Sequence, residues 1–90
     1  MTYELLQLPH VMRQLHNLRK THTPHLHEII GRIQSLAKNP RPAAAQKLVG
    51  RPEWRIRIGP YRVLYQIDDR NKVITIVAVA HRREVYKGRS

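Results

Sequence analysis

The stretch WRIRIGPYRVLYQID, residues 54–68, largely alternates apolar and polar side chains on both sides of a Gly-Pro pair. This alternation predicts two half-buried strands, over residues 54–58 and 61–67. Gly59 can adopt the positive φ that a two-residue type II′ turn requires at its first position, and the fixed φ of Pro60 suits the second. The stretch therefore predicts an antiparallel β-hairpin.

The two-residue turn also predicts the register of the hairpin. The expected opposed pairs are Ile58–Tyr61, Arg57–Arg62, Ile56–Val63 and Trp54–Tyr65. Opposed residues lie on the same face of a sheet, so Arg55, Arg57 and Arg62 should share one face, which we call the arginine face. The apolar residues should lie on the other face. A half-exposed strand needs polar residues on its solvent face, which is an ordinary explanation for Arg55 and Arg57 taken alone. A cluster of three arginines is more typical of an anion site.

The remaining chain predicts one more strand on each side of a helical pair. Residues 3–8 form a short apolar strand, and residues from Pro9 follow helical spacing until the THTP break. Thr23 is expected to cap a second helix that has Pro24 at its first position and that ends before Asn39-Pro40. Residues 40–53 form a connector with one short turn at 43–48, and residues 73–80 form an apolar central strand.

The predicted order is β-α-α-β-β-β in a single domain spanning residues 1–90. This order indicates an α+β fold in which an N-terminal helical hairpin packs on one face of a small, mostly antiparallel sheet. The other face of the sheet should be open. A chain of 90 residues supports one modest core of this kind.

Charge is the strongest compositional signal. The chain has 17 Lys and Arg against 6 Asp and Glu, a formal net charge of +11, which predicts a polyanionic partner. It has no cysteine, which excludes disulfides and thiolate metal sites. No stretch is long and apolar enough for a membrane span, so we expect a cytoplasmic protein with no membrane partner.

The C-terminal segment HRREVYKGRS, residues 81–90, is also strongly basic and contains Tyr86. A solvated basic tail is the plain explanation of such a segment. In its order of residues, however, HRREVY together with KLVGRPEWRIRIGPYRVLYQIDD, residues 47–69, resembles the RelE group of the RelE/ParE toxin superfamily. The predicted element order is similar to that family over essentially the whole chain.

The resemblance implies a ribosome-dependent messenger-RNA interferase, which cuts the message in the ribosomal A site without metal or cofactor. The catalytic residues that it implies are basic side chains of the second and third strands, an arginine after the last strand and a tyrosine near the end. By motif these are Arg55, Arg57, Arg62, Arg82 and Tyr86. The best-known relative has lysines where this chain has Arg55 and Arg57. Because arginine keeps its proton, these two residues can stabilise charge but cannot act as a base.

RNA cleavage without metal uses the 2′-hydroxyl as the nucleophile that attacks the adjacent phosphate, and this hydroxyl must lose its proton. The residues leave open which group accepts that proton. Neighbouring cations would favour the phenolate of Tyr86, whose alternative role is to stack on a base. The imidazole of His81 is a second candidate base. With a four-residue loop at 69–72, counting places Val79 opposite Arg62 and His81 on the arginine face. Arg83 remains an alternative to Arg82. The expected RNA-binding residues are Lys47, Arg51, His81, Arg83 and Lys87.

Two other functions fit the same sequence. A ParE-type toxin inhibits DNA gyrase by contact and cuts nothing, and a basic nucleic-acid-binding domain needs no catalytic group. For a toxin, the resemblance implies a cognate antitoxin that is small, acidic and partly disordered alone, and that forms a hetero-oligomer with this chain. The ribosome and messenger RNA are the other expected partners.

Overall fold

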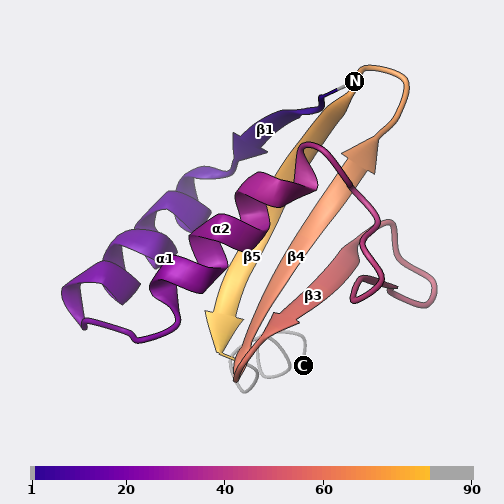
Figure 1. The fold of residues 1–90 in the computed structure, drawn as a ribbon. Helices are drawn as coiled ribbons and strands as arrows, with labels where there is room; N and C mark the ends of the chain where they lie inside the picture. Colours follow the sequence, from indigo (N-terminus) through magenta and orange to yellow (C-terminus); the bar gives the residue numbers. More distant parts are fainter. Residues whose placement is uncertain (1, 82–90) are drawn as a thin grey trace.

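The computed structural model describes residues 2–81, which form two helices and one five-stranded sheet (Figure 1). The elements are β1 (Glu4–Gln7), α1 (Pro9–Lys20), α2 (Leu26–Leu36), β2 (Gln46–Lys47), β3 (Trp54–Ile58), β4 (Tyr61–Asp68) and β5 (Val73–His81). The strand order is β1-β5-β4-β3-β2, with β1 parallel to β5 and the other pairs antiparallel. The predicted α+β fold class is confirmed.

The β3–β4 hairpin has the predicted register. Every predicted pair is present, from Ile58 opposite Tyr61 to Trp54 opposite Tyr65. Gly59 has φ +58°, the positive value that the turn requires. A Cβ atom on Gly59 would lie 2.5 Å from Nε2 of His25, so the turn also packs closely against the start of α2.

The helices form a pair on one side of the sheet, and α1 begins at Pro9 as predicted (Figure 1). Val11 of α1 is fully buried, and Ile29 and Ile33 of α2 join it in the core. The predicted Thr23 cap of the second helix is wrong, because α2 begins at Leu26. The Thr23 hydroxyl lies 3.0 Å from the Thr21 hydroxyl instead. The backbone carbonyl of Thr23 accepts a hydrogen bond from the backbone N–H of Leu26 in a turn.

One face of the sheet supplies most of the core. Its buried residues on β3, β4 and β5 are Ile56, Ile58, Val63, Tyr65, Ile74, Ile76 and Val79. Beyond the end of β1, side chains of α1 bond to the free edge of β5. Nε2 of His10 lies 2.7 Å from the Val77 carbonyl, and Oε1 of Gln14 accepts from the Val79 N–H at 2.9 Å.

A β-bulge in β5 changes the register between β4 and β5. The loop at 69–72 has the four residues that the counting assumed, and Tyr65 lies opposite Ile76. Leu64 then lies opposite Ala78, so Val77 is an extra residue and the later pairs move by one. The predicted pairing of Arg62 with Val79 is therefore wrong, because Arg62 lies opposite Ala80.

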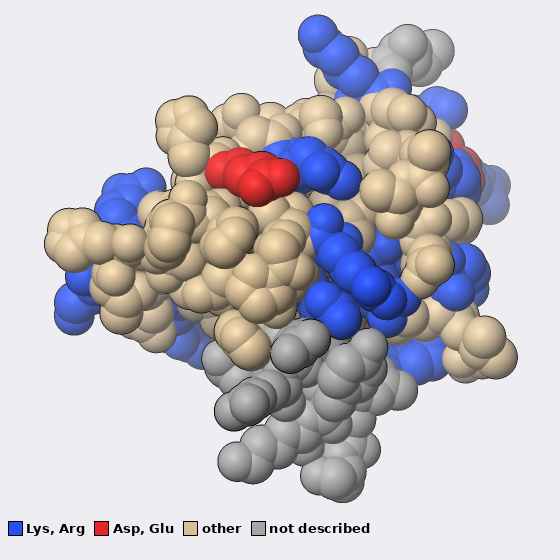
Figure 2. Space-filling view, turned by 60° about the horizontal axis from the view of Figure 1, so that its bottom comes forward, with Lys and Arg blue, Asp and Glu red and all other residues tan. Residues whose placement is uncertain are grey.

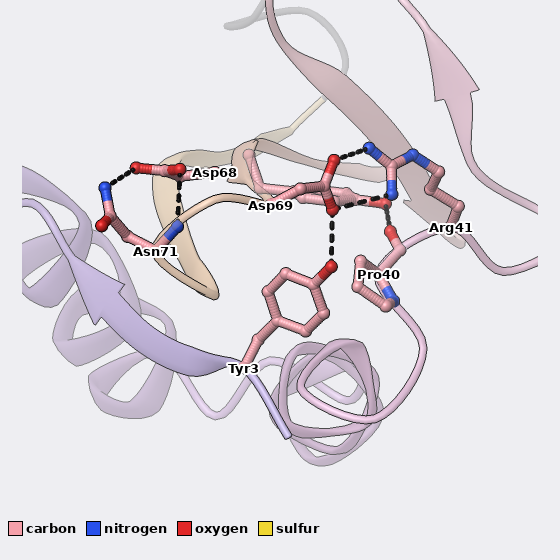
Figure 3. A network of polar contacts seen from close by, with 7 residues as sticks. Tyr3, Pro40, Arg41, Asp68, Asp69 and Asn71 are labelled. Atoms are coloured by element: carbon pink, nitrogen blue, oxygen red, sulfur yellow. Dashed lines mark hydrogen bonds and ion pairs between the residues drawn. The ribbon is translucent and has the colours of Figure 1, made fainter. Parts of the chain in front are cut away.

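The connector after α2 is attached to the far end of the sheet by a polar network (Figure 3). The Arg41 guanidinium donates to both carboxylate oxygens of Asp69, at 2.7 and 3.3 Å, and the Tyr3 hydroxyl donates to the same carboxylate at 2.5 Å. These hydrogen bonds, that from Arg41 first, lower the pKa of Asp69 to about 2. The Tyr65 hydroxyl donates to the Pro40 carbonyl at 2.7 Å, and burial raises the pKa of Tyr65 to about 12.

This network directs the connector across Trp54, whose ring lies 5.4 Å from the Arg41 guanidinium. The connector then returns as β2, a two-residue strand that the prediction of a single turn at 43–48 missed. Two residues are too short for an alternation pattern, so only pairing with β3 reveals this strand. Within residues 2–81, neither helix has the length and hydropathy needed to cross a bilayer.

Candidate RNA-binding and catalytic site

Arg55, Arg57 and Arg62 lie together on the sheet face opposite the helices. They alternate along β3 and β4 with residues of the core, and Arg57 is directly opposite Arg62. Arg55 and Arg57 are two residues apart on one strand, which separates their Cα atoms by about 6.5–7 Å. The structure thus brings together the three arginines predicted from the hairpin.

The three arginines differ in exposure. Arg57 is exposed and Arg55 is half-buried, whereas Arg62 is only 7% exposed. A guanidinium keeps its charge when buried, and charges interact more strongly where water is partly excluded. Arg62 is therefore placed to act strongly on an anion at this face, while Arg57 is accessible from solvent.

Gln46 of β2 orients Arg55. Gln46 lies opposite Arg55 in the sheet, and its Oε1 accepts a hydrogen bond from Nη2 of that arginine. Sequence reasoning missed this residue because β2 itself gave no pattern. The contact holds the guanidinium at the β2 edge of the arginine face.

Glu53 also lies on this face and binds polar groups there. Its carboxylate accepts from Nε of Arg51 at 3.0 Å and from Nε2 of Gln66 at 3.1 Å. Burial opposes ionisation of Glu53, but the hydrogen bond from Gln66 and the charge of Arg51 outweigh it, so its pKa falls below the usual value. Arg51, an expected RNA-binding residue, is thus in an ion pair at the edge of the face.

Lys47 does not join the three arginines. It lies opposite Trp54, which places it on the helix side of the sheet by register. Its ammonium group donates to the backbone carbonyl of Arg51 and so ties the ends of the loop between β2 and β3. In this position Lys47 contributes to the shape of the loop.

His81 lies on the other side of the sheet from the position predicted for it. The bulge at Val77 moves it opposite Tyr61, whose ring centroid is 5.6 Å away in an edge-to-face arrangement. Tyr61 shares its face with Ile58 and the core. The prediction that His81 lies on the arginine face is wrong, because counting through a regular ladder cannot reveal an extra residue.

Four predicted site residues lie outside the described part of the chain. They are Arg82, Arg83, Tyr86 and Lys87. Their roles, and the choice between Arg82 and Arg83, stay predictions from the sequence.

The described arginines can bind phosphate and stabilise negative charge that builds on it. Figure 2 views the molecule towards the end of the sheet that lies at the bottom of Figure 1, and it shows Lys and Arg side chains gathered near the middle of the surface that faces the reader. Within residues 2–81, no three His, Asp or Glu side chains are grouped as metal ligands.

This geometry agrees with a comparison of the sequence with known families. The model of the ParE toxin of type II toxin–antitoxin systems, parDE, matches residues 5–86. The chain belongs to the RelE/ParE toxin superfamily. The match confirms, at the level of the superfamily, the resemblance seen in the hairpin and tail motifs of this RelE/ParE toxin.

The toxin is also similar to solved structures of RelE toxins. It is 28% identical to a chain of the archaeal RelE–RelB complex from Pyrococcus horikoshii, with a TM-score of 0.76 over 91% of this toxin and 97% of that chain. It is 25% identical to an isolated E. coli RelE toxin, with a TM-score of 0.73, covering 97% and 94% of the two chains. A chain of the RelBE2 complex from Mycobacterium tuberculosis is 25% identical, with a TM-score of 0.71 and coverage of 90% and 99%. No curated protein matches this toxin.

Proposed function

We propose that this toxin is a metal-independent endoribonuclease that cuts messenger RNA in the ribosomal A site. The observation that carries the proposal is the arginine face, on which Arg57 and Arg62 are directly opposed next to Arg55. Like charges directly opposed across strands are destabilising, and an anion that binds between the two arginines would offset this cost. The scissile phosphodiester of RNA is such an anion.

In the proposed reaction the 2′-hydroxyl loses its proton and attacks the adjacent phosphorus atom, and the bond to the 5′-oxygen of the next nucleotide breaks. The products are a 2′,3′-cyclic phosphate and a 5′-hydroxyl, whose oxygen takes a proton from water. Arg55, Arg57 and Arg62 stabilise the negative charge on the phosphate oxygens, with Arg82 as a further cation. Arginine cannot accept the proton of the hydroxyl. Since His81 faces Tyr61 on the other side of the sheet, Tyr86 becomes the favoured proton acceptor.

A second candidate function is inhibition of DNA gyrase by contact. The match of residues 5–86 to the ParE toxin model favours it. Such a toxin needs a basic contact surface but no proton acceptor, so Tyr86 should then be dispensable.

The deciding experiment is a reconstituted translation reaction in which primer extension maps new ends in the message. We expect wild-type protein to cut at A-site codons, and Arg57→Ala and Tyr86→Phe to reduce cleavage by about 100-fold or more. Arg70→Ala, on the exposed β4–β5 loop, is the matched control and should cut normally. Full activity of both site variants would end this catalytic assignment. Loss of gyrase supercoiling without any cut message would favour the second candidate.

The proposal includes a cognate antitoxin as partner and the cytoplasm as location, where ribosomes are found. Relatives of this toxin were solved as RelB–RelE complexes from Pyrococcus horikoshii and Methanococcus jannaschii. With its net charge of +11, this chain should attract an acidic antitoxin that folds as it binds.

A further inference from the structure

A small pocket lies between α1 and the end of the sheet where β5 extends beyond β1. Its volume is about 240 Å³ and its lining includes Gln14, Asn17, Leu18, Tyr61, Val79 and His81. Sites for drug-sized ligands usually have roughly 300–1,000 Å³, so this pocket suits a smaller group.

Two aromatic rings form one wall of the pocket. The ring centroids of Tyr61 and His81 are 5.6 Å apart, and the two ring planes meet at an angle of 80°. The ring centroid of His25 lies 5.8 Å from that of Tyr61. Leu18 and Val79 add apolar surface next to them. Aromatic walls of this kind stack on single-stranded bases.

Two amides supply polar groups to the same pocket. The Gln14 side chain is oriented, because its Oε1 accepts a hydrogen bond from the Val79 N–H at 2.9 Å. This contact leaves the amino group of Gln14 as a donor. Asn17 lies one turn further along α1, is exposed, and has both a donor and an acceptor.

The pocket is close to the arginine face along the chain. Tyr61 precedes Arg62 directly, and the two side chains lie on opposite faces of β4 at the same end of the sheet. A strand of RNA whose phosphate binds Arg62 can therefore pass around this end and place a neighbouring base on the helix side.

We propose that this pocket binds one nucleobase of the RNA next to the scissile phosphate, an inference that depends on the proposed function. Gln14 donates to a carbonyl oxygen of the base, and the Asn17 carbonyl accepts from the adjacent ring N–H. Guanine and uracil carry this pair of groups, whereas adenine and cytosine have no ring N–H at that edge. The pocket thus selects guanine or uracil at one position beside the cut.

The first test compares cut-site profiles on a message with randomised codons. Wild-type toxin should favour guanine or uracil at one position by about tenfold, the value of one good hydrogen bond. Gln14→Glu keeps the oxygen that accepts from Val79 but replaces the donor with an acceptor, so it should remove or reverse the preference. Asn17→Asp is a second variant at an exposed position and should weaken it. Gln34→Glu makes the same charge change near the far end of α2 and should keep the wild-type profile.

The second test needs no cleavage. Fluorescence anisotropy measures the binding of labelled five-residue uridine and adenosine oligonucleotides to the purified toxin. The ratio of the affinity for uridine to that for adenosine should be about tenfold lower in Gln14→Glu than in Gln34→Glu. Because the same two oligonucleotides are used for both variants, differences between the oligonucleotides cancel in this comparison. A changed ratio in a protein that cuts no message supports the pocket and overturns the endoribonuclease. Normal cutting with an unchanged profile and ratio in both pocket variants overturns the pocket alone.

Discussion

Arg57 and Arg62 place two positive charges at directly opposed positions of a hairpin, and the cost of that placement is local. A threonine at either position would satisfy the strand with less repulsion. The two arginines also differ, because Arg57 is exposed and Arg62 is 7% exposed. At the scale of single residues, the site thus combines an accessible cation with a buried one.

Replacing Arg57 with Gln should stabilise the fold while it reduces cleavage. Relief of the repulsion is worth about 0.2–1 kcal/mol. For a domain of this size this corresponds to a rise in Tm of about 1–8 °C. Thermal denaturation in low salt measures the gain, which should shrink in about 1 M salt because salt screens exposed charges. Arg70→Gln is the control, and a fall in the Tm of Arg57→Gln would contradict this account of the pair.

At the scale of elements, the β3–β4 turn and the start of α2 constrain each other. Gly59 has a positive φ, which favours glycine, and a Cβ atom there would require the His25 ring to shift. Gly31 within α2 has no such constraint, because a Cβ atom there meets nothing within 4 Å.

Alanine at these two glycines should change stability in opposite directions. Gly59→Ala should destabilise by about 1–2 kcal/mol from the backbone alone, and further through the contact with His25. Gly31→Ala should stabilise by about 0.5–1 kcal/mol, because glycine is a poor helix residue. Urea denaturation measures both. In a His25→Ala background, Gly59→Ala should cost less but remain destabilising; an unchanged cost would show that the imidazole is not the obstacle.

The network that attaches the connector to the sheet should make stability depend on acid pH. The pKa of Asp69 falls from 3.8 to about 2 in the folded state, first through the hydrogen bond from Arg41. A lowered folded-state pKa contributes stability that is complete above about pH 4 and is lost as the pH falls towards 2.

Asp69→Asn is therefore expected to destabilise the toxin at pH 7 and to match the wild type near pH 2. Urea denaturation at several pH values gives the difference in free energy of unfolding between the two proteins. Glu28→Gln is the control, because its partner Arg32 is 4.0 Å away on the surface of α2 and such pairs contribute little. A difference between wild type and Asp69→Asn that stays constant with pH would assign the effect to something other than ionisation.

At the scale of the whole molecule, a net charge of +11 gives the toxin a general attraction for polyanions. Substitutions should affect RNA binding differently, depending on whether the cation acts through the overall charge or through direct contact at the arginine face. A cation that touches a phosphate releases a counterion, whereas a remote cation changes mainly the average field.

The salt dependence of RNA binding should separate these two contributions. Arg57→Gln should reduce the slope of log K against log salt by about 0.7 for single-stranded RNA. Arg70→Gln changes the net charge equally and should leave the slope nearly unchanged. Anisotropy titrations of a labelled RNA at four or more salt concentrations measure the slopes, and equal slopes for both variants would place Arg57 away from the phosphates.

The sequence by itself determined the fold class, the β3–β4 hairpin and its register, and the grouping of Arg55, Arg57 and Arg62 on one face. These features depend on short-range geometry, because a two-residue turn and the alternation of a strand fix which residues are opposed. Pro9 and the spacing after it likewise predicted the start of α1.

Only the tertiary structure decided the features that depend on how one segment pairs with or packs against another. The bulge at Val77 moved His81 away from the arginine face, and pairing with β3 created β2 and brought Gln46 to Arg55. The pocket beside Tyr61 exists because α1 packs along the edge of β5. Each depends on pairing or packing against another segment, whose free energy outweighs local preference and leaves no periodic mark in the sequence.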